Sequence, residues 1–482
     1  MRGTARRVDP LVLFGHAVLL ALLALSLWFA EERALLIDSA YQLFYDINHE
    51  SILINDHRFS MVFSQLLPWL LIKLHVPLRW VIVSYSAGFI AIAYVCYFVA
   101  VHVLRNRSMG MLMVFSLLAM RATFFHCISE TFQLMFFAPL LYATLESMGQ
   151  GRPSWWQWVL LVLSEVAAFF IHPVAAFFIA FIIVFRWIDC HRFDLPLAVV
   201  SLLLVACVAI KMLIGQSGHD QSFVPTGESL EYALRNFFHL NSIGFFYIHF
   251  PDFYLFPLVL WVVTMAGYVR RRLWLKLVLA ALFVPAFFAM SVVVYWEGDG
   301  PIGMERTYLP LLFFIGLLFW HDELPALQRY PVPVAVFYTL FVVLMLVSVV
   351  RIGISTRPYA NRLAEVDSIA AYSRSQGQHK LVVTRSTAER IFPINIWGLA
   401  LESMLYTARD GAGSTVTIYM EENDFDRSDS LYYDPYSYVS VNWWKRWPVA
   451  DLNPHYFLLP EQGYLELCKT DEGYTLAPLM SE

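Results

Sequence analysis

Two acidic residues, Asp38 and Glu130, stand beside apolar segments, where a carboxylate could do acid–base chemistry. Asp38 lies in LLIDSAYQLFYDI, soon after the first apolar segment, and Glu130 lies in HCISETFQLMFF, between two later ones. A partly desolvated carboxylate can act as a general base toward a hydroxyl group. Residue type alone favours a simpler role for Asp38 as a helix N-cap. Glu130 is equally half of a site or the partner of nearby Arg121 in a structural ion pair.

Three basic or titratable residues could bind an anion beside these acids. Arg58 in NDHRFS and Arg306 in GPIGMERTYLPLL each precede an apolar segment, and a guanidinium group suits bidentate contact with phosphate. For any single arginine of this kind, snorkelling to lipid headgroups is the more common role. His172 in FFIHPVAAFF could touch a metal or a phosphate, or could be a hydrogen-bonded turn residue. No HExxH pattern or cluster of histidines indicates a metal site.

The elements that must position these residues are apolar helices. Of the 482 residues, 59% are hydrophobic and 15% are charged, against roughly 45–50% and about 25% in soluble domains. Many apolar segments approach the roughly 20 residues that cross a bilayer as a helix. The sequence therefore predicts an α-helical polytopic membrane protein with about eleven spans, near residues 10–30, 80–104, 109–126, 131–148, 156–171, 173–188, 195–214, 254–269, 273–294, 307–320 and 331–350. With a net charge of −5, nucleic acid is not an expected partner.

The distribution of basic residues predicts the orientation of the spans. With the N-terminus in the cytoplasm, every inside loop receives arginine or lysine, including the run Arg270–Arg272, as the positive-inside rule requires. This holds only if residues 60–75 do not cross, so we expect them to form a helix at the outer interface. An odd number of spans places the C-terminal residues outside.

The chain then divides into two predicted domains. Residues 1–350 form the transmembrane domain, with a long acidic outer loop at 31–79. Residues 351–482 form a small α/β domain outside the membrane. Within it we expect helices at 361–374 and 395–408 and strands at 380–384, 415–420 and 456–459.

These motifs resemble the GT-C superfamily of membrane glycosyltransferases, in particular its protein-mannosyltransferase-like and aminoarabinose-transferase-like branch. The resemblance runs over residues 11–312. Asp38-Ser39-Ala40-Tyr41 is similar to the family's D-x-A-x-Y pattern, and Glu130 opens the fourth span. The sequence departs from the pattern where His57-Arg58-Phe59 replaces Lys-Pro-Pro or His-Pro-Pro, and where Thr307 separates Arg306 from Tyr308. Glu130 also stands where Asp is commoner.

The resemblance implies an inverting transfer of a sugar from a polyprenyl-phosphate donor to an acceptor hydroxyl on the outer face. Asp38 would accept the proton, with Glu130 as a second carboxylate, while Arg58, Arg306 and His57 would hold the donor phosphate. Further residues expected in the cavity are Tyr41, Arg121, His172 and Tyr308. The acceptor could be a glycan, a lipid or a protein, and some relatives use a divalent metal near the first acid. The expected location is a bacterial inner membrane, with the C-terminal domain in the periplasm.

The competing class is a membrane transporter or a flippase for lipid-linked sugars. Such folds often carry internal repeats and broken helices in corresponding halves. The sequence shows no repeat of this kind. The large acidic first loop and the C-terminal domain also favour the transferase over the transporter.

Overall fold

The computed structural model describes residues 9–149, 151–215, 226–298, 301–392, 397–421, 432–441, 446–471 and 473–479. Within these ranges seven helical segments are long and apolar enough to cross a membrane. The chain is therefore an α-helical membrane protein by the length and composition of its helices. The helices at these segments are α1 (Pro10–Trp28), α5 (Leu78–Phe98), α10 (Leu195–Ile214), α14 (Leu255–Arg271), α15 (Trp274–Val294), α16 (Pro301–Leu318) and α18 (Pro331–Ile354).

Four further helices occupy the other predicted spans. They are α6 (Arg107–Phe115), α7 (Glu130–Met148), α8 (Trp155–Phe169) and α9 (Ala175–Cys190). Residues 60–75, expected at the interface, form the short helix α4 (Val62–Lys73), which leaves Leu66, Leu67 and Leu70 exposed. Such an exposed apolar face suits a helix that lies against lipid.

The helices begin and end where local chemistry requires it. At the start of α10, Asp194 is the N-cap and its Oδ1 accepts a hydrogen bond from Leu197 N at 3.1 Å. The helix ends at Gly215, whose φ of 89° is easy only for glycine. The apolar run between them is thus bounded by residues that satisfy or release the terminal backbone groups.

The predicted span at 109–126 is wrong as a single helix. Helix α6 ends at Phe115, and two 3-10 turns follow at Ser116–Ala119 and Ala122–Phe125. The cause is the buried acid Glu305 on α16, whose Oε2 accepts hydrogen bonds from the backbone N–H groups of Arg121 at 3.1 Å and Thr123 at 2.9 Å. These donors bond the carboxylate instead of extending the helix.

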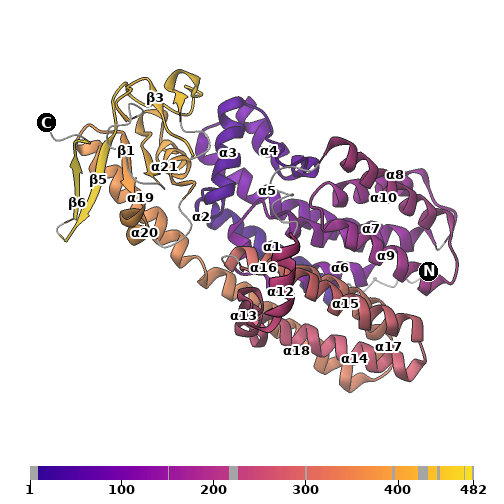
Figure 1. Cartoon of the computed structure of the whole chain (residues 1–482). Helices are drawn as coiled ribbons and strands as arrows, with labels where there is room; N and C mark the ends of the chain where they lie inside the picture. Colours follow the sequence, from indigo (N-terminus) through magenta and orange to yellow (C-terminus); the bar gives the residue numbers. More distant parts are fainter. Residues whose placement is uncertain are drawn as a thin grey trace.

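The C-terminal segment contains a four-stranded sheet beside helices α19 (Arg357–Ser375), α20 (Arg385–Ile391) and α21 (Leu399–Ala408). The strand order is β2-β1-β5-β6, with β1 parallel to β2 and β5, and β5 antiparallel to β6. The strands are β1 (Lys380–Thr384), β2 (Thr417–Glu421), β5 (Leu465–Thr470) and β6 (Gly473–Ala477). In Figure 1 the sheet lies at one end of the molecule, far from the N-terminus.

Some predicted elements of this segment match the structure and one does not. Strand β1 covers the predicted strand at 380–384, while α21 begins later than the helix expected at 395–408, of which residues 395 and 396 lie outside the described ranges. The strand predicted at 456–459 is wrong. Tyr456 lies in a turn, and its hydroxyl donates to the Val76 carbonyl at 3.0 Å. This run is apolar because it packs on the loop after α4, not because it joins the sheet.

The C-terminal segment docks on the first outer loop through helix α3 (Ile37–His49) (Figure 1). Asn453 donates from its side chain to the Ile47 carbonyl at 3.0 Å, and its backbone N–H donates to Asn48 Oδ1 at 2.8 Å. The rings of Phe44 and Phe457 pack beside these bonds in a tilted arrangement, with centroids 5.1 Å apart. Helix α3 therefore lies between the sheet and the helix bundle.

Labelling of introduced cysteines tests the orientation predicted from the basic loops. In a parent with Cys190 and Cys468, the two partly exposed cysteines, replaced by Ser, we expect an impermeant maleimide to label Asp410→Cys on intact cells. Arg270→Cys should react only after the membrane is permeabilised, because the positive-inside rule places it in the cytoplasm. Labelling of Arg270→Cys on intact cells would contradict this orientation.

Candidate functional site

Asp38 lies in the first turn of α3 but is not its N-cap. Leu36 is the residue at the cap position, and its own side chain makes no capping hydrogen bond. The Asp38 Oδ2 atom instead lies 2.9 Å from Nε2 of His126, whose side chain is only 4% exposed. The Asp38 side chain is 43% exposed. One carboxylate thus combines a fixed orientation with an accessible side.

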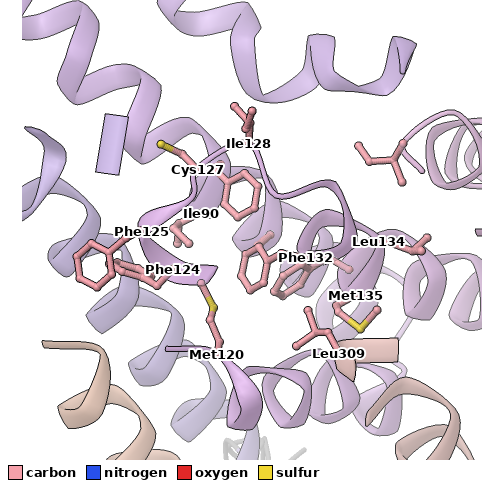
Figure 2. Packing of buried hydrophobic residues seen from close by; sticks show 14 of the residues in the cluster. Ile90, Met120, Phe124, Phe125, Cys127, Ile128, Phe132, Leu134, Met135 and Leu309 are labelled. Atoms are coloured by element: carbon pink, nitrogen blue, oxygen red, sulfur yellow. The ribbon is translucent and has the colours of Figure 1, made fainter. Parts of the chain in front are cut away.

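The segment that carries His126 is held by apolar packing on both sides. It connects the last 3-10 turn to α7, and Figure 2 shows Phe124 and Phe125 before the histidine and Ile128 and Phe132 after it. All four side chains are buried. His126 is therefore a polar residue anchored inside an apolar loop, with Asp38 as its hydrogen-bond partner.

Glu130, the first residue of α7, forms a buried ion pair with Arg58. The structural pair considered between Glu130 and Arg121 is wrong. Arg121 lies 3.4 Å from Oε1 of Glu305, the acid that also bonds the backbone near it. The two acids therefore have different arginines, and Glu130 is joined to one of the expected phosphate ligands.

Arg306 on α16 lies close enough to both carboxylates of the candidate site for its charge to affect them. Its positive charge acts on Asp38 and on Glu130, and its side chain is half-buried. Within the described ranges it forms no ion pair with an acidic residue. His172 also acts on Glu130, and its Nδ1 accepts a hydrogen bond from Val174 N at 3.2 Å. The hydrogen-bonded turn expected as the simpler role of His172 is thus present.

The protonation state of Asp38 follows from these neighbours. Burial raises the pKa of the Asp38 carboxyl, but the hydrogen bond from His126 and the charge of Arg306 outweigh it and hold the pKa below its ordinary value. A carboxyl group with a lowered pKa is ionised at neutral pH. Asp38 is therefore in the form that can accept a proton.

Several buried polar atoms near these residues have no hydrogen-bond partner within the described part of the chain. Such atoms cost about 1–3 kcal/mol each, and in native proteins each calls for an explanation such as a bound molecule or a catalytic role. Three of these atoms belong to direct neighbours of the site residues: His57 Nδ1 precedes Arg58, Ser129 Oγ precedes Glu130, and His126 Nδ1 is on the ring that bonds Asp38. The others are side-chain atoms of Gln65 on α4, Tyr85 on α5 and Gln133 on α7.

Two of the expected cavity residues lie elsewhere. Tyr308 is fully buried, and its hydroxyl donates to the Ser242 carbonyl at 2.8 Å. Tyr41 packs on Trp397 with ring centroids 6.0 Å apart and lines a small pocket with Leu401 and Tyr438. Tyr41 thus belongs to the contact with the C-terminal segment, and Tyr308 belongs to the core of the bundle.

One cavity, of about 520 Å³, lies away from the candidate site. It lies at the start of α1 and is lined by residues such as Phe14, Met111 and Trp320. Among the described residues, one group of three ligand-type side chains comes close enough for a metal: Asp189, His321 and Asp322. Asp189 lies near the end of α9, and His321 and Asp322 follow the end of α16. Arg306 lies near the opposite end of α16, so this group is remote from the candidate site. The metal expected near Asp38 stays a prediction, because no group of three such side chains lies around Asp38 among the described residues.

The sequence analysis did not single out two of the residues that matter here. His126 stands four positions before Glu130 in an otherwise apolar run, and this placement is the signal that could have identified it. Glu305 directly precedes Arg306 in the sequence. Its role depends on contacts with residues about 180 positions away, which no local pattern reveals.

Comparison of the chain with protein-family models, with curated proteins and with solved structures finds no match.

The Arg58–Glu130 pair predicts a stability effect that a double-mutant cycle measures. Arg58→Met should lower the free energy of unfolding by about 3–5 kcal/mol, because it leaves the buried carboxylate without its nearest counter-charge. Arg58→Met combined with Glu130→Gln should cost less than the sum of the two single variants.

Denaturant unfolding in detergent measures these values. The exposed pair of Arg385 and Glu389 supplies the control, since Arg385→Met should change stability by less than about 1 kcal/mol. Additive losses at Arg58 and Glu130 would contradict the pairing.

Proposed function

We propose that this chain is an inverting glycosyltransferase of the GT-C type, which moves a sugar from a polyprenyl-phosphate donor to an acceptor hydroxyl. One observation carries the proposal. Asp38, Glu130, Arg58 and Arg306 come from four separate segments, and they lie within reach of one another's charges. The resemblance of their motifs to this superfamily supports the same assignment.

In the proposed reaction Asp38 is the general base. His126 holds one carboxylate oxygen at 2.9 Å, so the accessible side of the group can receive the proton of the acceptor hydroxyl. The acceptor oxygen then forms the glycosidic bond as the bond between the sugar and the donor phosphate breaks. The polyprenyl phosphate leaves with the electron pair of that bond. A positioned base of this kind contributes about 10²–10⁴-fold to the rate.

The leaving phosphate requires positive charge, which Arg306 and Arg58 supply. Arg306 is the stronger candidate because it forms no ion pair within the described ranges, whereas Arg58 already bonds Glu130. The buried Nδ1 of His57, beside Arg58, could add a hydrogen bond to a phosphate oxygen. Preorganised charges of this kind are usually the largest contribution to catalysis.

The proposal includes a topology in which α7, α8 and α9 also cross the bilayer, as does α6 together with the two 3-10 turns that follow it. With the seven segments described above they give the eleven spans expected from the sequence. The sheet and helices of residues 351–482 then form an α/β domain on the outer side, next to the acceptor. This arrangement suits an inner membrane of a bacterium with the domain in the periplasm.

Asp38→Asn tests the assignment of the base. The variant should fold and bind the donor, while the rate of sugar transfer falls about a hundredfold or more, because the amide cannot take a proton. Asp46→Asn on the same helix is the matched control. Burial raises the pKa of Asp46, and its Oδ1 accepts a hydrogen bond from Leu53 N at 2.7 Å. The amide oxygen of Asn can accept the same bond, so this replacement should keep the parent rate.

Sugar transfer from purified polyprenyl-phosphate donor to an acceptor measures both rates. Transfer by Asp38→Asn at close to the parent rate would reject Asp38 as the base. Movement of the lipid-linked sugar across vesicles without any transfer would favour the flippase class instead.

Arg306→Ala tests the phosphate assignment. It should raise the KM for the donor and lower kcat, and Arg306→Lys should rescue it only in part because the bidentate fork is lost. Arg235, exposed and paired with Glu231, is the control, since Arg235→Ala should leave both constants unchanged. Equal donor dependence in Arg306→Ala and the parent would make Arg306 a headgroup anchor.

A further inference from the structure

Glu402 on α21 joins the C-terminal segment to the turn that presents Asp38. Its Oε1 accepts a hydrogen bond from the backbone N–H of Ile37 at 2.7 Å. Its Oε2 accepts from Nε of Arg362 on α19 at 2.7 Å. The side chains of Glu402 and Arg362 are essentially inaccessible to solvent. A buried ion pair therefore ends on a backbone group next to the proposed base.

The backbone at Ile37 is in a conformation that its side chain disfavours. Its φ is 45°, in the left-handed region, where a β-branched residue is a clear outlier. Leu36 at the cap position offers no side-chain acceptor to the first N–H groups of α3, which have no partner inside a helix. The Glu402 carboxylate supplies an acceptor for one of them. Such strain persists only where the surroundings hold the backbone in place.

The start of α21 approaches this turn backbone against backbone. A Cβ atom added at Gly398 would lie 3.3 Å from Ile37 Cα and 3.4 Å from its carbonyl oxygen. This contact is tighter than most, so a larger residue at Gly398 would push the turn by tenths of an ångström. Position 398 thus sets the distance between the C-terminal segment and the residue before Asp38.

We propose that Glu402 and Arg362 are positioning residues for catalysis, which fix the left-handed turn at Ile37 and so the direction of the Asp38 carboxylate. This inference rests on the proposed function, because Asp38 matters only if it is the base. Arg362 holds Glu402, Glu402 holds the Ile37 N–H, and the turn aims Asp38 at its partner His126. The C-terminal segment is then part of the catalytic apparatus and not only a docking surface for the acceptor.

Other contacts keep the segment in place when this one is removed. Asn453 bonds Ile47 and Asn48, and Arg409 lies 3.2 Å from Glu31. Loss of the Glu402 contact alone should therefore leave the segment docked. A change in turnover without undocking would separate positioning from simple structural support.

Two double variants differ only in the acceptor for the Ile37 N–H. Arg362→Met with Glu402→Met replaces the ion pair by apolar side chains of similar size, which usually preserves folding, but it removes the acceptor. Arg362→Met with Glu402→Gln also removes both charges, yet keeps an oxygen for the N–H. We expect the first to lower kcat about ten- to a hundredfold with the donor KM unchanged, and the second to restore kcat toward the parent.

A second pair of variants tests the same turn by size. Gly398→Ala should lower kcat in the same direction, because its Cβ would press on Ile37. Gly413→Ala in the same segment is its control, since a Cβ there meets no atom within 4 Å. Equal kcat in the two double variants, with no effect of Gly398→Ala, would overturn the positioning role.

Hydrogen exchange of the Ile37 amide gives a readout that does not need activity. The amide should be protected in the parent and in the Gln double variant, and should exchange faster in the Met double variant. Equal exchange in all three would reject the contact itself. If the parent transfers no sugar, the proposed function fails, and the exchange rates still decide whether Glu402 holds the turn.

Discussion

An ionised side chain removed from water is costly unless an opposite charge meets it, and this constraint fixes where distant segments of the chain lie. Arg58 and Glu130 are 72 residues apart, and Arg362 and Glu402 are 40 apart. Each pair is buried, so neither partner can move without exposing the other's charge to an apolar surrounding. The first pair joins the outer loop to α7, and the second joins two helices of the C-terminal segment beneath the turn before Asp38. These two pairs therefore fix the positions of the helix bundle and the C-terminal segment around the residues next to Asp38.

Glu305 shows how one buried acid shapes the candidate site. By accepting the backbone N–H groups of Arg121 and Thr123, it stops the helix that the apolar sequence would otherwise continue. The chain from there to α7 becomes an irregular loop, and this loop carries His126 to Asp38. If the helix continued through residue 126, the direction of the His126 side chain would be set by the helix axis. His126 could then not turn toward Asp38 in the loop at 31–79. The geometry of the proposed base thus depends on an acid that does not touch it.

Much of this arrangement could be predicted from the sequence, because hydropathy and basic loops are local signals. These signals predict that Asp38, Glu130 and Arg306 lie at one end of the helices. In the structure the charges of these three residues do act on one another. The partner of each charge could not be predicted, since it depends on tertiary contacts: Arg58, not Arg121, bonds Glu130. The strand predicted at 456–459 is wrong for the same reason. This apolar run packs on the loop at 31–79, whereas the more polar β5 enters the sheet.

A second buried charge cluster, at the other end of the bundle, shows what distinguishes the candidate site. There Lys276 Nζ bonds both Asp189 at 2.6 Å and Asp322 at 2.8 Å, so both acids contact a positive charge directly. Asp38 and Arg306 are opposite charges that act on each other without forming an ion pair in the described residues. Opposite charges in a low-dielectric site attract strongly, so they stay apart only where the fold holds them. The left-handed turn at Ile37 and the helix α16 supply that restraint, and in the proposed reaction Asp38 meets the acceptor hydroxyl while Arg306 meets the donor phosphate.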